Sequence, residues 1–145
     1  MTTKLIKVTD TTLRDAHQSL FATRFNNSTI SKLAPILDKV GYDVLEVWGG
    51  ATFDSCIRYL NEDPWDRLKM IKRLAPNTNL SMLIRGANLV GYRHYSNEII
   101  NEFVSVSADF GIDIFRLFDA LNYPGNLETA SKAIKNKNKH LQLTI

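Results

Sequence analysis

Charged and amide side chains recur directly after four short hydrophobic runs of the chain. The runs cover residues 5–9, 44–48, 80–84 and 112–118. The polar residues that follow them are Asp10, Arg14, Asp15, His17, Gln18, Asp54, Arg85, Tyr92, Arg93, His94, Asp119 and Asn122. If the runs are parallel strands, their carboxyl ends meet on one edge, where functional residues of such folds collect. The recurrence therefore predicts a functional rim.

The residue types on this rim suit an anionic substrate. Arg14 and Arg85 offer planar forks for carboxylates and are candidates for holding a small keto acid. Asp15 can ligate a divalent cation, although one ligand does not make a metal site. Tyr92 and Asp54 could stabilise charge at an enolate, and equally could make ordinary hydrogen bonds.

Several common catalytic patterns are absent from the sequence. His17, His94 and His140 show no metal-ligand spacing. We expect the first two to be structural or to support neighbouring site residues, and His140 to be exposed. Cys56 has no evident partner, which favours an inert, packed thiol. The sequence also lacks a Gly-x-Gly-x-x-Gly after its first run, a Gly-Lys-Ser/Thr phosphate loop and a Gly-x-Ser-x-Gly elbow.

Helical periodicity separates the strand-like runs. We expect a helix over 28–40, capped by Ser28, ended by Gly41, and kinked or delayed by Pro35. A second helix should follow the Asp63-Pro64 cap and run to residue 74. A third runs from Ser96 towards Gly111, a short fourth surrounds 127–134, and 140–145 alternates as a fifth strand.

This alternation predicts an α/β fold with a parallel sheet. Four βα units fill the 145 residues, whereas a complete (β/α)₈ barrel needs about 250. The chain is therefore a small doubly wound sheet or about half a barrel. In a barrel, strand alternation places Glu46 and Arg116 inward, on the same face as Trp48 and Phe118, and we expect Glu46 and Arg116 to form a buried ion pair.

Composition describes one ordinary globular domain. The chain is 44% hydrophobic and 23% charged, with a formal net charge of +3. Its basic residues are interleaved with acidic ones, so we expect no nucleic-acid partner. One cysteine fits a reducing compartment, and no apolar run approaches the roughly 18 residues of a spanning helix. Without an apolar leader at the N-terminus, we expect a cytoplasmic protein.

Five longer motifs are more specific than any single residue. They are DTTLRDAHQSLFATR (10–24), EVWGGATFD (46–54), EDPWDRL (62–68), MLIRGANLVGYRHY (82–95) and FRLFDALN (115–122). Together they closely resemble the biotin-dependent carboxyltransferase family. SLFATR, FDSCIR and GYRHY look most like the oxaloacetate decarboxylase α subunit, with the B-type subunit of pyruvate carboxylase and the transcarboxylase subunit as alternatives. A related class of metal-dependent lyases shares the Asp-Thr-Thr-Leu-Arg-Asp opening but usually continues with glycine.

The resemblance implies a (β/α)₈ TIM barrel that moves a carboxyl group between oxaloacetate or pyruvate and biotin through a metal-stabilised enolpyruvate. It implies that Asp15 ligates a divalent metal such as Zn, Co or Mn, and that Arg14, Gln18 and Arg85 hold the keto acid. Asp54, Tyr92 and Asp119 match residues lining the reaction centre. The implied partners are a small keto acid, a biotinyl domain on a separate domain or subunit, membrane-pump subunits of the parent enzyme, and further copies of the chain.

Other parts of the family pattern are missing from the 145 residues. They are the carbamylated lysine, the His-x-His metal ligands, the catalytic threonine and the biotinylated lysine. We therefore expect residues 1–145 to be the N-terminal part of the barrel domain, with four βα units, the start of strand five and no complete second domain. We expect this fragment to be inactive alone. A non-catalytic half-barrel that assembles with itself through its open sheet edges is the contrasting hypothesis.

Overall fold

A five-stranded parallel sheet organises the computed structural model, which describes residues 6–145. Its strands lie side by side in chain order. They are β1 (Thr9–Asp10), β2 (Val44–Trp48), β3 (Asn79–Arg85), β4 (Ile112–Phe118) and β5 (His140–Leu143). Strands in chain order, joined by helices, match the first part of a (β/α)₈ barrel, so the predicted fold class is confirmed.

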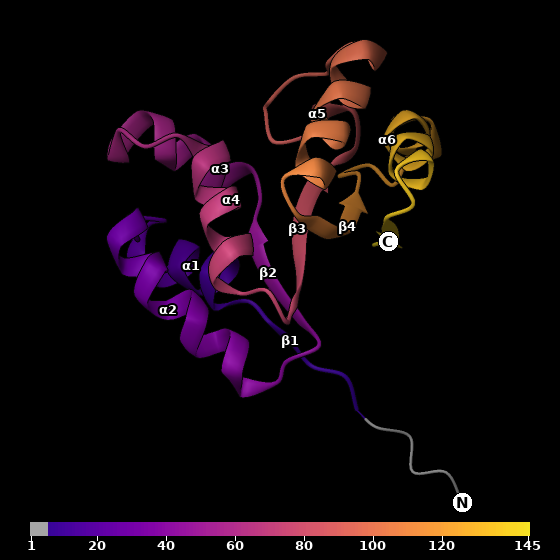
Figure 1. Ribbon diagram of the computed structural model, residues 1–145. Helices are drawn as coiled ribbons and strands as arrows, with labels where there is room; N and C mark the ends of the chain where they lie inside the picture. The colour runs from indigo at the N-terminus through magenta and orange to yellow at the C-terminus, as the bar shows by residue number, and fades with distance from the viewer. Residues whose placement is uncertain (1–5) are drawn as a thin grey trace, which may run out of the picture.

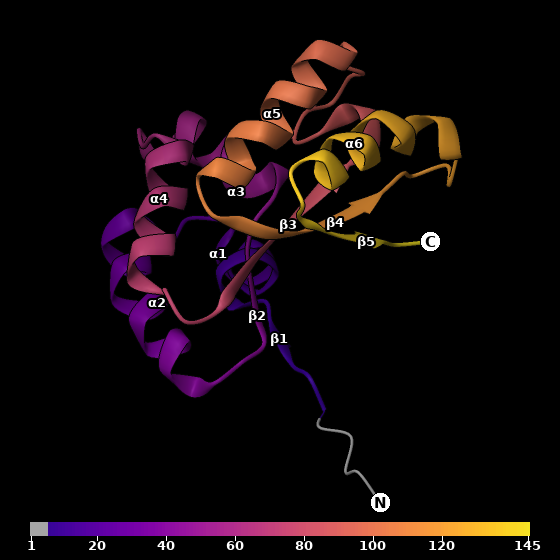
Figure 2. The same cartoon turned by 45° about the vertical axis from the view of Figure 1, so that its right-hand side comes forward.

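Helices connect the strands and cover one side of the sheet. The longer ones are α2 (Asn27–Val40), α4 (Pro64–Leu74), α5 (Asn97–Asp109) and α6 (Pro124–Asn136). Shorter helical segments are η1 (Thr12–Ala16), α1 (His17–Phe21), α3 (Gly50–Ser55), η2 (Cys56–Leu60) and η3 (Gly86–Asn88). Figures 1 and 2 show the longer helices following one another around the outside of the strands. None of the described helices is long and apolar enough to cross a membrane.

The helix ends show how far capping signals determine local structure. Asp63 accepts hydrogen bonds from the N–H groups of Trp65 and Asp66, which confirms the predicted start of α4. For α2 the predicted cap was wrong, because Asn26 rather than Ser28 accepts the Thr29 N–H. Pro35 lies inside a helix that starts well before it, while Gly41, at φ 86°, ends that helix as expected.

The region around the first strand differs most from the prediction. We predicted a strand over 5–9, of which Leu5 lies outside the described residues, but β1 covers only Thr9–Asp10. The polar segment that follows is helical, and no helix was predicted there. The Thr11 carbonyl accepts the N–H groups of Arg14, Asp15 and Ala16, which winds η1 into a wide turn. The helical segments after β2 were also not predicted, and α6 is longer because Pro124 starts it.

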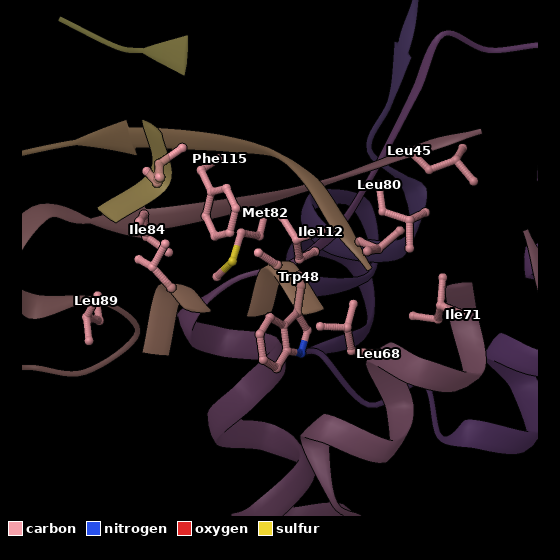
Figure 3. Packing of buried hydrophobic residues seen from close by; sticks show 14 of the residues in the cluster. Leu45, Trp48, Leu68, Ile71, Leu80, Met82, Ile84, Leu89, Ile112 and Phe115 are labelled. Atoms are coloured by element: carbon pink, nitrogen blue, oxygen red, sulfur yellow. The ribbon is translucent and has the colours of Figure 1, made fainter. Parts of the chain in front are cut away.

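The core lies between the sheet and the helices. Leu45, Leu80, Met82, Ile84 and Phe115 from the strands pack with Leu68 and Ile71 of α4 (Figure 3). Trp48 belongs to this side as well, with its ring 5.0 Å from that of Trp65. The prediction that Trp48 points inward was therefore wrong. The pairing of β2 with β3 shifts between Glu46 and Trp48, and this irregularity turns Trp48 towards the helices.

Candidate functional site

The rim begins where β1 turns into η1. Asp10 accepts hydrogen bonds from both the N–H and the hydroxyl of Thr12, at 3.0 and 2.9 Å, and so fixes the turn. The wide turn of η1 then brings the side chains of the consecutive residues Arg14 and Asp15 into contact. Wide helical turns of this kind are often found at functional sites. A local backbone feature thus positions two of the predicted site residues.

Arg14 is held from behind by a buried carboxylate. Its Nε and Nη2 atoms each lie 2.5 Å from Oε1 of Glu46, and the Glu46 side chain is only 2% exposed. Arg116 approaches the same carboxylate from β4, with Nη2 donating to Oε1 at 3.3 Å and Nε 3.0 Å from Oε2. The predicted Glu46–Arg116 ion pair is therefore present, but only Glu46 is buried, since the Arg116 side chain is 31% exposed. Arg14 makes it a cluster of three charged groups.

Asp15 is the exposed member of this region. Its side chain is 54% exposed, and its Oδ1 accepts a hydrogen bond from Nη1 of Arg14 at 3.1 Å. Among residues 6–145, no group of three His, Cys, Asp or Glu side chains could hold a metal ion. Asp15 can thus supply one ligand. The described residues alone do not form a metal site.

Arg85 lies at the end of β3, within a tight loop. Its Nη1 donates to the Gly91 carbonyl at 3.1 Å, and its guanidinium lies 5.3 Å from the centre of the Tyr92 ring. Gly50 makes room for this arginine, because a Cβ at Gly50 would lie 2.8 Å from Nη2 of Arg85. A Cβ there would also lie 2.9 Å from the Val90 carbonyl oxygen, so the close approach of the loop after β3 to the start of α3 depends on a glycine.

Asp54 and Tyr92 line the same surface cleft. The cleft has a volume of about 490 Å³ and lies between α3, η2 and the loop after β3. Asp54 also pairs with Arg58 one helical turn later, at 2.7 Å from Nε to Oδ1. Tyr92 is 73% exposed. The cleft therefore combines an acidic group, a phenol and the basic side chains of Arg58 and Arg93.

Asp119 is engaged by its own loop. Its Oδ2 accepts the N–H groups of Leu121 and Tyr123, and its Oδ1 accepts a hydrogen bond from Asn126. These hydrogen bonds, led by that of Tyr123, hold the pKa of Asp119 below its usual value. In this structure Asp119 organises the connection from β4 to α6.

The remaining candidates differ in how far they are buried. His17 is buried against the Phe25 ring, with centroids 5.1 Å apart, while Gln18, His94, Asn122 and His140 are exposed. Burial lowers the pKa of His17 to about 4, assisted by the positive charge of Arg67. Cys56 is buried, and burial raises its pKa to about 11, as expected for an inert thiol.

Two features of the site were missed from the sequence. Arg14 was not expected to share Glu46, because this contact depends on how η1 lies against β2 and no sequence pattern indicates it. Arg58 was missed because no helix was predicted after β2, and its spacing of four residues from Asp54 was the available signal.

Comparison with curated proteins shows high similarity over nearly the whole chain. It is 54% identical over 138 residues to the B-type subunit of pyruvate carboxylase from Methanocaldococcus jannaschii, covering 95% of this chain and 24% of that protein. It is 51% identical over 140 residues to the methylmalonyl-CoA carboxyltransferase 5S subunit of Propionibacterium freudenreichii, covering 97% of this chain and 28% of that protein. The chain thus spans about a quarter of these relatives. No protein-family model matches it.

Solved structures agree with the sequence relatives. The carboxyl transferase domain of Rhizobium etli pyruvate carboxylase with pyruvate matches 99% of this chain at a TM-score of 0.93 and 45% identity, over 25% of its own length. The same domain with oxamate and biotin matches 97% of this chain at a TM-score of 0.92 and 46% identity, over 24% of its own length. The predicted family resemblance is confirmed.

Proposed function

Because the chain belongs to the family of carboxyltransferase domains found in pyruvate carboxylase and the transcarboxylase 5S subunit, we propose that it supplies part of a site that moves a carboxyl group between a keto acid and biotin. Residues 1–145 are proposed to be the N-terminal part of the barrel domain. The keto acid is pyruvate or oxaloacetate, and biotin arrives on a separate domain or subunit.

The observation that supports this proposal is the arrangement of Arg14 and Asp15. Arg14 is held by a buried carboxylate, while the adjacent Asp15 remains more than half exposed. Arg14, Gln18 and Arg85 are proposed to bind the keto acid carboxylate, since guanidinium groups pair well with such anions. A related carboxyl transferase domain has been solved with pyruvate and with oxamate and biotin, which supports the same substrate class here.

The cleft lined by Asp54 and Tyr92 is proposed to lie beside the biotin ring. A carboxylate and a phenol at one cleft can hold or pass a proton near the reacting atoms. Asp119 is proposed to act by ordering the loop after β4 at the edge of the reaction centre, since both of its oxygens accept hydrogen bonds from that loop. The fixed arginines would offset the charge that develops on an enolate.

A divalent metal, as the resemblance implies, would act as a Lewis acid on the keto acid when bound. Asp15 suits one position of its coordination shell, but the described residues do not provide the other ligands. We propose that ligands from outside residues 6–145 complete the shell. Arg14 would hold the Asp15 carboxylate in position for that metal.

Among the family members, an enzyme of the transcarboxylase 5S type or one with the B-type subunit of pyruvate carboxylase has the better support. Both are found among the relatives, at 51% and 54% identity respectively. The oxaloacetate decarboxylase α subunit, which we favoured from SLFATR, FDSCIR and GYRHY, has no such support. The membrane-pump partners, the cytoplasmic location and the self-assembling, non-catalytic half-barrel stay predictions.

The proposal is tested in the full-length polypeptide that contains this chain. With a biotinyl domain and divalent metal supplied, it should release pyruvate from oxaloacetate, and Arg14→Ala should reduce kcat/KM by about 100-fold or more. Residues 1–145 expressed alone should show no turnover. A folded, metal-loaded full-length protein with no carboxyl transfer to or from either keto acid would refute the proposed function.

A further inference from the structure

Glu46 occupies an unusual place in the sheet. It lies in the middle of β2, its side chain is 2% exposed, and it contacts positive groups from two other parts of the chain. Arg14 comes from the turn after β1 and Arg116 from β4, so the carboxylate links β2 to the segment after the neighbouring strand β1 and, across β3, to β4. A buried charge without such partners would be strongly unfavourable.

The cluster has an excess of positive charge. Two guanidinium groups share one carboxylate, so Glu46 neutralises only one of them. Arg14 has five N–H donors, and within residues 6–145 three of them are engaged, two by Glu46 and one by Asp15. The cluster therefore keeps donors and a net positive charge next to the exposed Asp15.

The geometry points to Glu46 as a positioning residue: with Arg116, it sets the direction of the Arg14 guanidinium and, through Arg14, the direction of the Asp15 carboxylate. This inference rests on the proposed function, because Arg14 and Asp15 are the groups proposed to meet the keto acid and the metal. Glu46 does not touch the reacting atoms. It acts by holding Arg14 from the buried side.

Arg116 has a distinct part in this arrangement. By engaging the same carboxylate, it prevents Glu46 from fully neutralising Arg14 and fixes the plane of the carboxylate. Removing Arg116 leaves a neutral Arg14–Glu46 pair, whose attraction for an anionic substrate is weaker. A lysine at this position would restore the charge but not the planar fork.

The matched control is the second buried arginine–glutamate pair. Arg67 is 1% exposed and pairs with Glu62, which also accepts the Asn27 N–H at 2.8 Å. This pair joins α4 to the start of α2 and lies outside the proposed site. Glu62→Gln therefore disturbs an arginine–glutamate pair of the same chemistry that, among residues 6–145, makes no hydrogen bond or ion pair with Arg14.

The experiment measures KM and kcat for oxaloacetate, together with the thermal midpoint, in the full-length enzyme. We expect Glu46→Gln to lower kcat/KM by about 10- to 100-fold, mainly by raising KM. Glu62→Gln should lower the thermal midpoint and leave KM unchanged. Arg116→Met should raise KM by about tenfold. Arg116→Lys, which keeps the positive charge, should have a KM much closer to that of the wild type.

Two outcomes would overturn the inference while the proposed function survives. In the first, the wild type is active and the Glu46→Gln variant differs from it only in thermal midpoint, as the Glu62→Gln variant does. The second applies if the Glu46→Gln variant does not fold. An Arg116→Met variant with an unchanged KM would then refute the positioning role of Glu46 and Arg116. A folded wild type without carboxyl transfer would instead refute the proposed function itself.

Discussion

The two faces of the sheet have opposite chemical character. On the face covered by helices, the strands present Leu45, Leu80, Met82 and Phe115, all fully buried. On the other, concave face, a cavity of about 680 Å³ is lined by polar side chains that include Glu46, Ser81, Arg116 and Gln142. Barrel interiors are usually filled by branched apolar residues. The contrast indicates that the helix-covered face stabilises the fold, while charged side chains on the concave face support the residues of the rim.

This difference also separates two kinds of carboxylate. Glu46, on the concave face, contacts residues far away in the sequence. Asp119, at the end of β4, is held by residues two to seven positions away. Long-range contacts fix the relative placement of several strands, whereas local ones shape a single loop. A variant at Glu46 should therefore disturb the rim more widely than one at Asp119.

The largest expected effect compares two residues of similar size on opposite faces of β4. Leu117 is fully buried against the helices, while Ile114 is partly exposed at the concave cavity. Leu117→Ala should reduce the free energy of unfolding by about 2–5 kcal/mol, and Ile114→Ala by less than about 1.5 kcal/mol. Urea denaturation measures both. Equal losses would show that the concave face contributes as much to stability as the helix-covered face.

His17 is a polar exception among the residues packed on the helical side. Neither ring nitrogen has a hydrogen-bond partner among residues 6–145, and burial lowers the pKa of His17 to about 4. The unfolded chain takes up the proton near pH 6.5, while the folded protein resists it down to about pH 4. Stability supplied by neutral His17 is therefore present above pH 6.5 and is lost as pH falls towards 4.

We expect that loss to amount to about 3 kcal/mol between pH 6.5 and 4. His17→Phe should abolish this loss of stability on acidification. It should leave stability at pH 7 nearly unchanged, because a phenyl ring can keep the contact with Phe25. Denaturation midpoints measured across this pH range test the expectation, with His140→Gln, at an exposed position, as the control. An unchanged pH profile in His17→Phe would contradict it.

Sequence signals predicted the elements whose ends are chemically marked. The bounds of β2, β4 and α4 were as expected, because alternation and the Asp63-Pro64 cap define them locally. The segments η1 and α1 could not be found this way, since their polar sequence has no helical periodicity and the turn depends on the Thr11 carbonyl. Trp48 was misplaced because the irregular β2–β3 pairing breaks the alternation.

The candidate site divides in the same manner. The rim residues were chosen as candidates because they follow strands, and their role in a site stays a prediction. The Glu46–Arg116 pair was predicted because strand alternation placed both residues on one face, and that pair is present. Arg14 on Glu46 depends on how η1 folds back over β2, and pattern alone does not contain that contact. Local periodicity thus predicts which face a residue occupies, but not which distant side chain it meets.

The smallest expected effect concerns Asp113, at the opposite end of the sheet from the rim. It accepts hydrogen bonds from Lys72 at 2.8 Å, from the Leu80 N–H and from Lys139 at 3.1 Å each. Burial raises its pKa, but these hydrogen bonds, led by that of Lys72, outweigh burial and leave the pKa below its usual value. Its contribution is therefore present above about pH 4 and disappears as pH falls through the lowered pKa.

Asp113→Asn should cost about 1 kcal/mol at pH 7, because the side chain is one-quarter exposed and solvent screens the two lysine contacts. Asp109→Asn, which removes a more exposed pair with Lys137, should cost less. Denaturant titrations at pH 7 and pH 3 separate the two. The free energies of unfolding of the wild type and of Asp113→Asn should differ less at pH 3 than at pH 7. A difference as large at pH 3 as at pH 7 would mean that Asp113 stabilises the strand starts through packing rather than charge, and the polar face would then be structural at this end of the sheet.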